Sequence, residues 1–173
     1  MAYFAALVAR SGRGWKAREV DVADIVDPDL VADLLRDASA DGRGGAAVLL
    51  VEREDEWFGV ARLDADDELR VFVSDGYAAA RSDLGPVLVP TVADQEVADE
   101  APTGGAGPED EEASDGASVR IAVPAGDADL LADLGTPGPD LLELCEEEGV
   151  LPAEALVVLA ENAGFADVYE ALR

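Results

Sequence analysis

The chain contains no histidine and only one cysteine, Cys145, among its 173 residues. A zinc deaminase needs a trio of His or Cys ligands, and a serine hydrolase of the usual kind needs a His base, so the sequence excludes both classes of enzyme. A single thiol forms no disulfide within the chain, which favours a reducing cytoplasm. Walker A and dinucleotide-binding fingerprints are absent as well. We therefore expect no cofactor, no bound metal and no catalytic residues.

Basic side chains are also scarce. Twelve Lys and Arg residues stand against 39 acids, which gives a formal net charge of −27 and a sequence pI of about 4.1. Phosphate backbones bind to clustered Lys and Arg, so we expect no direct nucleic-acid binding, and anionic membrane surfaces are disfavoured for the same reason. Residues 1–9 lack the basic start of a signal peptide, and no apolar run approaches the roughly 18 residues of a membrane span.

The charge is unevenly placed along the chain. Residues 1–81 carry ten basic side chains against seventeen acids, whereas residues 82–173 carry two against twenty-two. Residues 91–118 are rich in Asp, Glu, Gly, Pro, Ala and Ser, a composition that buries too little apolar surface to offset the entropy of ordering. The sequence thus predicts an α+β domain over residues 1–90, a disordered acidic linker over 91–118, and a mainly helical segment over 119–173 that packs on the first domain.

The pattern of apolar residues predicts the elements of each part. Short polar loops separate the strands, which is typical of an antiparallel sheet, and about two helices accompany it. The fold class is therefore α+β. We expect strands at 3–9, 15–22, 47–52, 57–63 and 69–74, a helix beginning at 27–28, a short helix at 77–83, a short strand or extended chain at 118–123, and helices at 127–134, 140–148, 152–163 and 166–172.

Three further patterns could carry chemistry, and each has a structural interpretation that we favour. Residues 54–56 are paired carboxylates of the kind that glycosidases use, but in so acidic a chain they indicate an exposed loop. Residues 64–68 resemble the start of a calcium loop that lacks both Gly at its sixth position and Glu at its twelfth. Cys145 precedes three glutamates, whose charge raises a thiol pKa, so a buried structural thiol is favoured over a nucleophile.

Two groups of residues are candidates for a protein–protein interface. Strand alternation predicts that one of the neighbouring aromatics Trp57 and Phe58 faces inward and the other outward, where it could anchor a partner, although packing within the fold is the favoured interpretation. The helices after the linker add a row of acids that a basic partner would attract. The candidate interface residues are Trp57, Phe58, Asp129, Asp133, Glu146, Glu147 and Glu148.

Several stretches in the predicted ordered parts resemble a known family when taken in order on either side of an acidic linker. They are Tyr3-Phe4-Ala5-Ala6, residues 54–60 (EDEWFGV), 70–75 (RVFVSD), 126–135 (GDADLLADLG), 141–149 (LLELCEEEG) and Leu151-Pro152. Together they are similar to the actinobacterial tRNA adenosine deaminase-associated proteins, and the resemblance covers nearly the whole chain except the linker. It implies an association with the deaminase that makes inosine at the tRNA wobble position. It brings no catalytic residues with it.

Three functions are then compatible with the sequence. The first is a non-catalytic, cytoplasmic accessory protein that binds or regulates the tRNA adenosine deaminase, whose RNA-binding surface must be basic and would attract an acidic partner. The second is an interaction or scaffold domain of unknown partner, whose gene lies near that of the deaminase but whose product does not bind it. The third, which we disfavour, is an enzyme that works with carboxylates alone.

Overall fold

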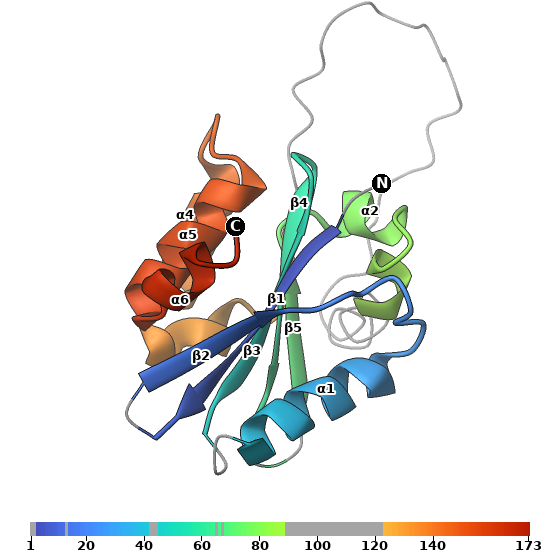
Figure 1. The fold of residues 1–173 in the computed structure, drawn as a ribbon. Helices are drawn as coiled ribbons and strands as arrows, with labels where there is room; N and C mark the ends of the chain where they lie inside the picture. The colour runs from blue at the N-terminus through green and yellow to red at the C-terminus, as the bar shows by residue number, and fades with distance from the viewer. Residues whose placement is uncertain (1–2, 13, 42–44, 65, 67, 89–122) are drawn as a thin grey trace, which may run out of the picture.

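A six-stranded antiparallel sheet runs through the middle of the molecule, with the strands in the order β2-β1-β3-β4-β5-β6 (Figure 1). The computed structural model describes residues 3–12, 14–41, 45–64, 66, 68–88 and 123–173. The elements in chain order are β1 (Tyr3–Ser11), β2 (Gly14–Glu19), α1 (Pro28–Asp41), β3 (Ala47–Arg53), β4 (Trp57–Leu63), β5 (Leu69–Val73), α2 (Gly76–Ala80), β6 (Ala125–Gly126), η1 (Ala128–Leu134), α4 (Gly138–Glu146), α5 (Pro152–Ala163) and α6 (Ala166–Glu170).

The central strands are apolar on both faces of this sheet. All seven residues of β3 are buried, as are six of the seven in β4. Successive side chains of a strand point to opposite faces, so each strand contributes to two separate hydrophobic clusters. Leu49 and Trp57 belong to one cluster, and their neighbours Leu50 and Phe58 belong to the other. Because neither face can remain in water, the sheet needs a covering layer on each side.

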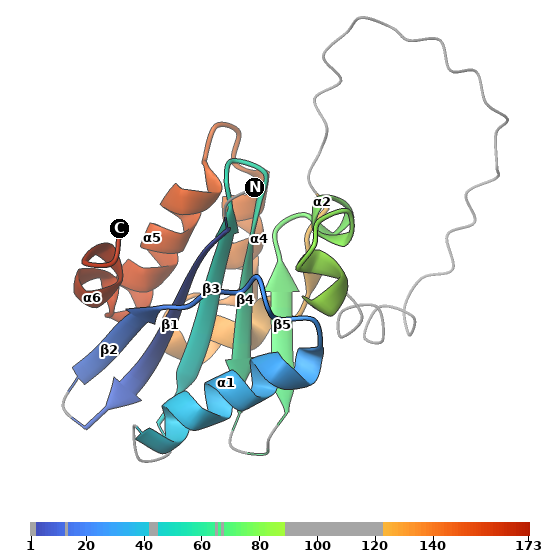
Figure 2. The same ribbon diagram turned by 45° about the vertical axis from the view of Figure 1, so that its right-hand side comes forward.

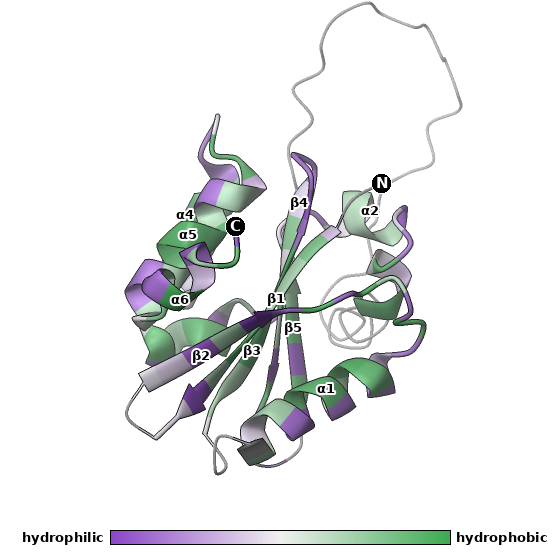
Figure 3. Cartoon of the chain, in the orientation of Figure 1, coloured by the Kyte–Doolittle hydropathy of each residue, from purple (hydrophilic) through white to green (hydrophobic). Residues whose placement is uncertain are grey.

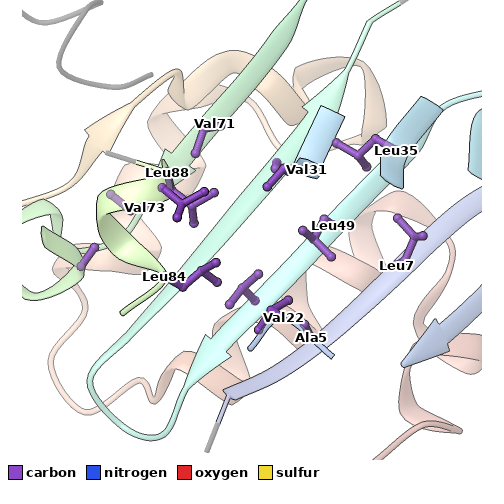
Figure 4. Close-up of a cluster of buried hydrophobic side chains, with 14 of the residues drawn as sticks. Ala5, Leu7, Val22, Val31, Leu35, Leu49, Val71, Val73, Leu84 and Leu88 are labelled. Carbon is purple, nitrogen blue, oxygen red and sulfur yellow. The ribbon is translucent and has the colours of Figure 1, made fainter. Parts of the chain in front are cut away.

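One layer is formed by α1, α2 and residues 84–88. The carboxylate of Asp27 accepts a hydrogen bond from the backbone N–H of Asp29 at 2.8 Å, which satisfies a donor at the start of α1. Polar and apolar residues alternate along this helix, in purple and green in Figure 3. Its buried residues Val31 and Leu35 pack on the sheet near Leu49, and Leu84 and Leu88 fill the remainder of the same cluster, as Figure 4 shows.

The second layer is formed by η1, α4, α5 and α6, which lie on the opposite side of the sheet from α1 and α2 (Figure 1). Its connection to the sheet is β6, which pairs with β5. Gly126 there has a φ of +104°, and a Cβ atom would lie 2.2 Å from the carbonyl oxygen of Val71, so only glycine fits this approach. The large side chains that the layer buries completely are Leu130, Leu131, Leu141, Leu156, Leu159, Phe165 and Tyr169.

The structure confirms the predicted α+β class and the antiparallel sheet. It differs in two details. Residues 128–134 form a 3-10 helix, and the short strand after the predicted linker is Ala125–Gly126, because these two residues continue the ladder of β5. The predicted linker at 91–118 lies outside the described residues, as does most of the expected strand at 118–123. No helix in the described ranges is both long enough and apolar enough to cross a membrane.

We expect the two layers to unfold together, because both complete the core of one sheet. Leu156→Ala removes a fully buried side chain from the second layer and should lower the free energy of unfolding by about 2–5 kcal/mol. Trp57 lies on the other face of the sheet. In a Trp15→Phe background it is the sole tryptophan, so its fluorescence and the far-UV circular dichroism should shift to the same lower urea concentration. A dichroism transition that moves while the Trp57 signal stays in place would show two independent units.

Candidate interaction surface

The outer side of the second layer is strongly acidic. Residues 123–173 contain twelve carboxylate side chains and a single basic residue, Arg173. Eleven of the twelve acids are exposed. We call this set the acidic surface; its members are Asp129, Asp133, Asp140, Glu143, Glu146, Glu147, Glu148, Glu154, Glu161, Asp167 and Glu170.

Helix α4 carries three members of the acidic surface. Asp140, Glu143 and Glu146 are spaced three residues apart, so they lie along one side of the helix. Leu141 is fully buried and fixes the opposite side to the core, while Leu142 is 39% exposed beside the acids. The helix therefore displays a row of carboxylates, together with an apolar side chain, on a support that is anchored in the protein core.

The predicted acids lie at the two ends of α4. Asp129 lies at its start, where a Cβ atom on Gly138 would lie 2.4 Å from the Asp129 carboxylate, so glycine lets η1 approach α4. Glu146 ends its last turn, about 12 Å further along the helix axis, and Glu147 and Glu148 come directly after it. The sequence analysis did not single out Asp140 and Glu143, which lie between these ends. Their helical spacing was the signal that could have found them.

Asp133 is exposed like its neighbours, but it is already engaged within the protein. Both of its carboxylate oxygens accept hydrogen bonds from the guanidinium group of Arg62, one of them at 2.8 Å. The same guanidinium donates to the carbonyl oxygen of Leu130 at 2.8 Å, and its Nε lies 3.3 Å from a carboxylate oxygen of Asp64. Since Arg62 belongs to β4, this paired contact fastens η1 to the sheet.

A second arginine makes a similar link one strand away. Nε of Arg70, on β5, donates a 2.6 Å hydrogen bond to Asp127, and its Nη1 donates to Asp64 at 3.2 Å. The other carboxylate oxygen of Asp127 accepts the backbone N–H of Asp129 at 3.0 Å, which caps η1. Asp127 therefore joins the sheet to the first turn of the second layer.

These contacts lower the pKa values of both Asp127 and Asp133. The hydrogen bond from Arg62 is the main reason why the pKa of Asp133 lies below its ordinary value; partial burial opposes the shift and the positive charge adds to it. Burial acts to raise the pKa of Asp127, but the hydrogen bonds from Arg70 and from the Asp129 backbone outweigh it, so that this pKa is also lowered. Both carboxylates are held in their ionised form.

The chain's last residue makes a third link between the layers. Nη1 of Arg173 donates to the carboxylate of Glu52 at 2.8 Å and to the hydroxyl oxygen of Tyr169 at 3.3 Å. The guanidinium also lies over the ring of Phe4, 5.3 Å from its centroid. Glu52 is only 9% exposed, so Arg173 neutralises a largely buried charge and is not available to balance the acidic surface.

The two neighbouring aromatics both pack within the fold, which agrees with the favoured interpretation and overturns the alternative of an exposed anchor. Trp57 is fully buried and Phe58 is 2% exposed, on opposite faces of the sheet. Trp57 makes an edge contact with Tyr3, and Phe58 lies against Phe72. The expectation that one of the pair points outward is wrong, because both faces of the sheet are covered by helices. Neither ring is therefore at the surface where a partner could reach it.

Reactive chemistry is not favoured by the remaining candidates. Burial, with a smaller effect from the charge of Glu146, raises the pKa of the Cys145 thiol to about 12, so the thiol stays protonated and is a poor nucleophile. In the described ranges no three His, Cys, Asp or Glu side chains gather closely enough to hold a metal ion. Among residues 54–56, Glu56 pairs with Arg53 at 3.1 Å, and all three are exposed in the turn between β3 and β4.

We expect the Arg62–Asp133 contact to make stability depend on pH. Because the pKa of Asp133 is lowered in the folded state, its contribution is present at neutral pH and is lost as the pH falls below about 4. Asp133→Asn should lower the free energy of unfolding at pH 7, by less than about 1 kcal/mol since the side chain is 60% exposed. This difference from the wild type should shrink as the pH falls below about 4.

Urea unfolding at a series of pH values measures that difference. Glu161→Gln is the matched control, because it removes the same charge from an exposed position on α5 without breaking a contact to the sheet. A loss that is equal at pH 7 and pH 2, or one that the control reproduces, would contradict the assignment of this effect to the contact with Arg62.

Comparison with known proteins adds one finding. No curated protein and no solved structure matches the chain. A family model described as Rv3753c-like tRNA adenosine deaminase-associated protein matches residues 3–166, nearly the whole chain. That description denotes a protein associated with the deaminase and not the deaminase itself, in agreement with the sequence resemblance. The chain belongs to the family of Rv3753c-like tRNA adenosine deaminase-associated proteins.

Proposed function

We propose that this protein is a non-catalytic accessory protein that binds a tRNA adenosine deaminase through the acidic surface. The family description, which names an association with the tRNA adenosine deaminase, supports this choice of partner. The observation that carries the choice of surface is the row of exposed carboxylates on α4, which is rigidly supported by Leu141 and has no cation of its own among the described residues. Such a partner would place the protein in the cytoplasm.

Charge complementarity supports this choice of surface. An enzyme that acts on tRNA binds a polyanion, and the surfaces that do so are rich in Lys and Arg. The acidic surface presents carboxylates at helical spacing to such a surface, with Leu142 and Leu151 exposed among them at 39% and 44%. Long-range attraction would speed association, and the apolar side chains would contribute burial at contact. Binding at this place would compete with tRNA for the deaminase.

A non-catalytic role is supported by the composition of the chain. Adenosine deamination by zinc enzymes needs a metal held by His and Cys side chains and an adjacent Glu. This chain has no His and one Cys, and the pKa of that Cys is raised to about 12. Its effect on inosine formation would therefore pass through the deaminase, by covering or exposing the surface that binds the RNA.

The direct test is a titration of the tRNA adenosine deaminase from the same organism with this protein, at 50 and 300 mM salt. We expect binding that weakens at least about tenfold at the higher salt, because exposed charges are screened. The triple variant Glu146→Lys, Glu147→Lys and Glu148→Lys should weaken binding at low salt by about tenfold or more. Labelled tRNA should be displaced from the deaminase by the wild-type protein.

The matched control is Asp24→Lys, Asp37→Lys and Asp83→Lys, which makes the same change of charge at exposed positions on the α1 side of the sheet. It should bind nearly as well as the wild type. Equal losses in the two triple variants would indicate non-specific attraction. Absence of binding at 50 mM salt would contradict the proposed function and favour a scaffold role with a different partner.

A further inference from the structure

The β1–β2 hairpin carries two basic residues that form no ion pair with any described carboxylate. Of the nine basic side chains in the described ranges, five pair with carboxylates and two, Arg10 and Arg81, lie over the aromatic rings of Trp15 and Tyr77. The remaining two, Lys16 and Arg18, are exposed and make no ion pair with any described residue. In a protein of net charge −27, two adjacent unpaired cations on one strand need an explanation.

Lys16 and Arg18 border a groove on the α1 side of the sheet. The groove has a volume of about 350 Å³, and its mostly apolar floor is formed by Leu7 and Ala9 of β1, with Ala38 of α1 at one side. It exists because α1 covers β1, β3 and β4 but does not extend over β2, as Figure 2 shows. No acidic side chain lines the groove in the part of the chain that the structure describes.

The groove lies beside an unpaired sheet edge. β2 is the outermost strand of the sheet and pairs with β1 alone. In an antiparallel pair, every second residue of a strand directs its backbone N–H and C=O groups to the partner strand. Val20 donates its N–H to the carbonyl oxygen of Ala5 on β1. The backbone groups of Gly14, Lys16 and Arg18, which precede Val20 in steps of two, therefore also face β1. Those of Trp15, Ala17 and Glu19 therefore point away from the sheet. No described residue pairs with them. The opposite edge, β6, is only two residues long.

From this geometry we propose that the edge of β2 binds an extended acidic peptide segment of a partner protein, which adds to the sheet as a further antiparallel strand over the groove. The backbone groups of Trp15, Ala17 and Glu19 would hold the peptide, as in other cases of strand addition. Lys16 and Arg18 point to one face and lie two residues, or about 7 Å, apart. They therefore select acidic side chains at alternate positions of the peptide.

The charges of Lys16 and Arg18 favour an acidic peptide over a second copy of the chain as the strand that pairs with β2. If two copies paired antiparallel through β2 about Ala17, Lys16 of each copy would lie opposite Arg18 of the other, and like charges that face each other destabilise a strand pair. Cations on an edge strand oppose self-association in this way, yet the same pair attracts an acidic strand. The groove opens on the α1 side of the sheet, whereas α6, with Asp167 and Glu170 of the acidic surface, packs on the other face of β2. The inference makes no use of the acidic surface, so it does not depend on the proposed function.

Selection from a displayed library of random octapeptides, with the full-length protein as bait, tests the proposal. We expect the enriched peptides to carry Asp or Glu at alternate positions. A labelled synthetic copy of the strongest one is then titrated by fluorescence anisotropy. Lys16→Glu with Arg18→Glu should weaken its binding by about tenfold or more. Arg81→Glu reverses one exposed charge near α2, beyond the other end of the sheet, and should leave the affinity unchanged.

Ala17→Pro tests the backbone contacts. The N–H of Ala17 points away from β1, so proline removes a donor that no ladder bond uses, as on other sheet edges, and peptide binding should fall by about tenfold or more. Amide exchange in the wild type gives a second readout that no substitution disturbs. The peptide should slow exchange at Trp15, Ala17 and Glu19, whereas Lys16 and Arg18 are already bonded to β1 and should change little.

Three results would overturn the assignment. The first is a selection that enriches no alternating acidic pattern. The second is slowed exchange elsewhere in the protein with none at Trp15, Ala17 and Glu19. The third is a dimer in sedimentation equilibrium that Ala17→Pro dissociates, which would show that a second copy of the chain pairs with β2.

Discussion

A sheet whose central strands are apolar on both faces is the constraint on which the rest of this structure depends. Every residue of β3 is buried, so water must be excluded from two faces at once. One face is covered by α1, α2 and the residues after α2, and the other by the helices from η1 to α6. The C-terminal helices are therefore half of the protein core, although their own sequence is too short to enclose one.

The same arrangement explains where the charge lies. Helices that are apolar on their inner side and acidic on their outer side place carboxylates on a firm support. The few cations nearby lie at the boundary between the sheet and these helices. Arg62, Arg70 and Arg173 each form an ion pair with a carboxylate on the other side of that boundary. Apart from Asp133, which pairs with Arg62, the acidic surface is consequently left without balancing charge among the described residues. In the described chain the unpaired cations, Lys16 and Arg18, lie across the molecule, on the α1 side of β2.

Much of this organisation could be predicted from local patterns. Alternation and capping residues indicated the strands and most helices, because these signals depend on neighbours in sequence. The two-sided burial was missed at Trp57 and Phe58, although a nearly continuous apolar strand is a sign of it. The contact between Arg62 and Asp133 joins residues 71 positions apart. No local pattern encodes such a pair, since it depends on how η1 lies against β4, so the sequence marked Asp133 as simply exposed.

Hydrogen–deuterium exchange of the full chain tests directly whether the acidic surface is the binding face. Amide exchange rates are compared with and without the tRNA adenosine deaminase from the same organism. If the deaminase binds this surface, exchange should slow in residues 127–148, which include η1 and α4, and should be unchanged in α1 on the far side of the sheet. If the deaminase slows exchange in α1 but leaves residues 127–148 unchanged, or changes neither, the assignment of function to this surface is contradicted.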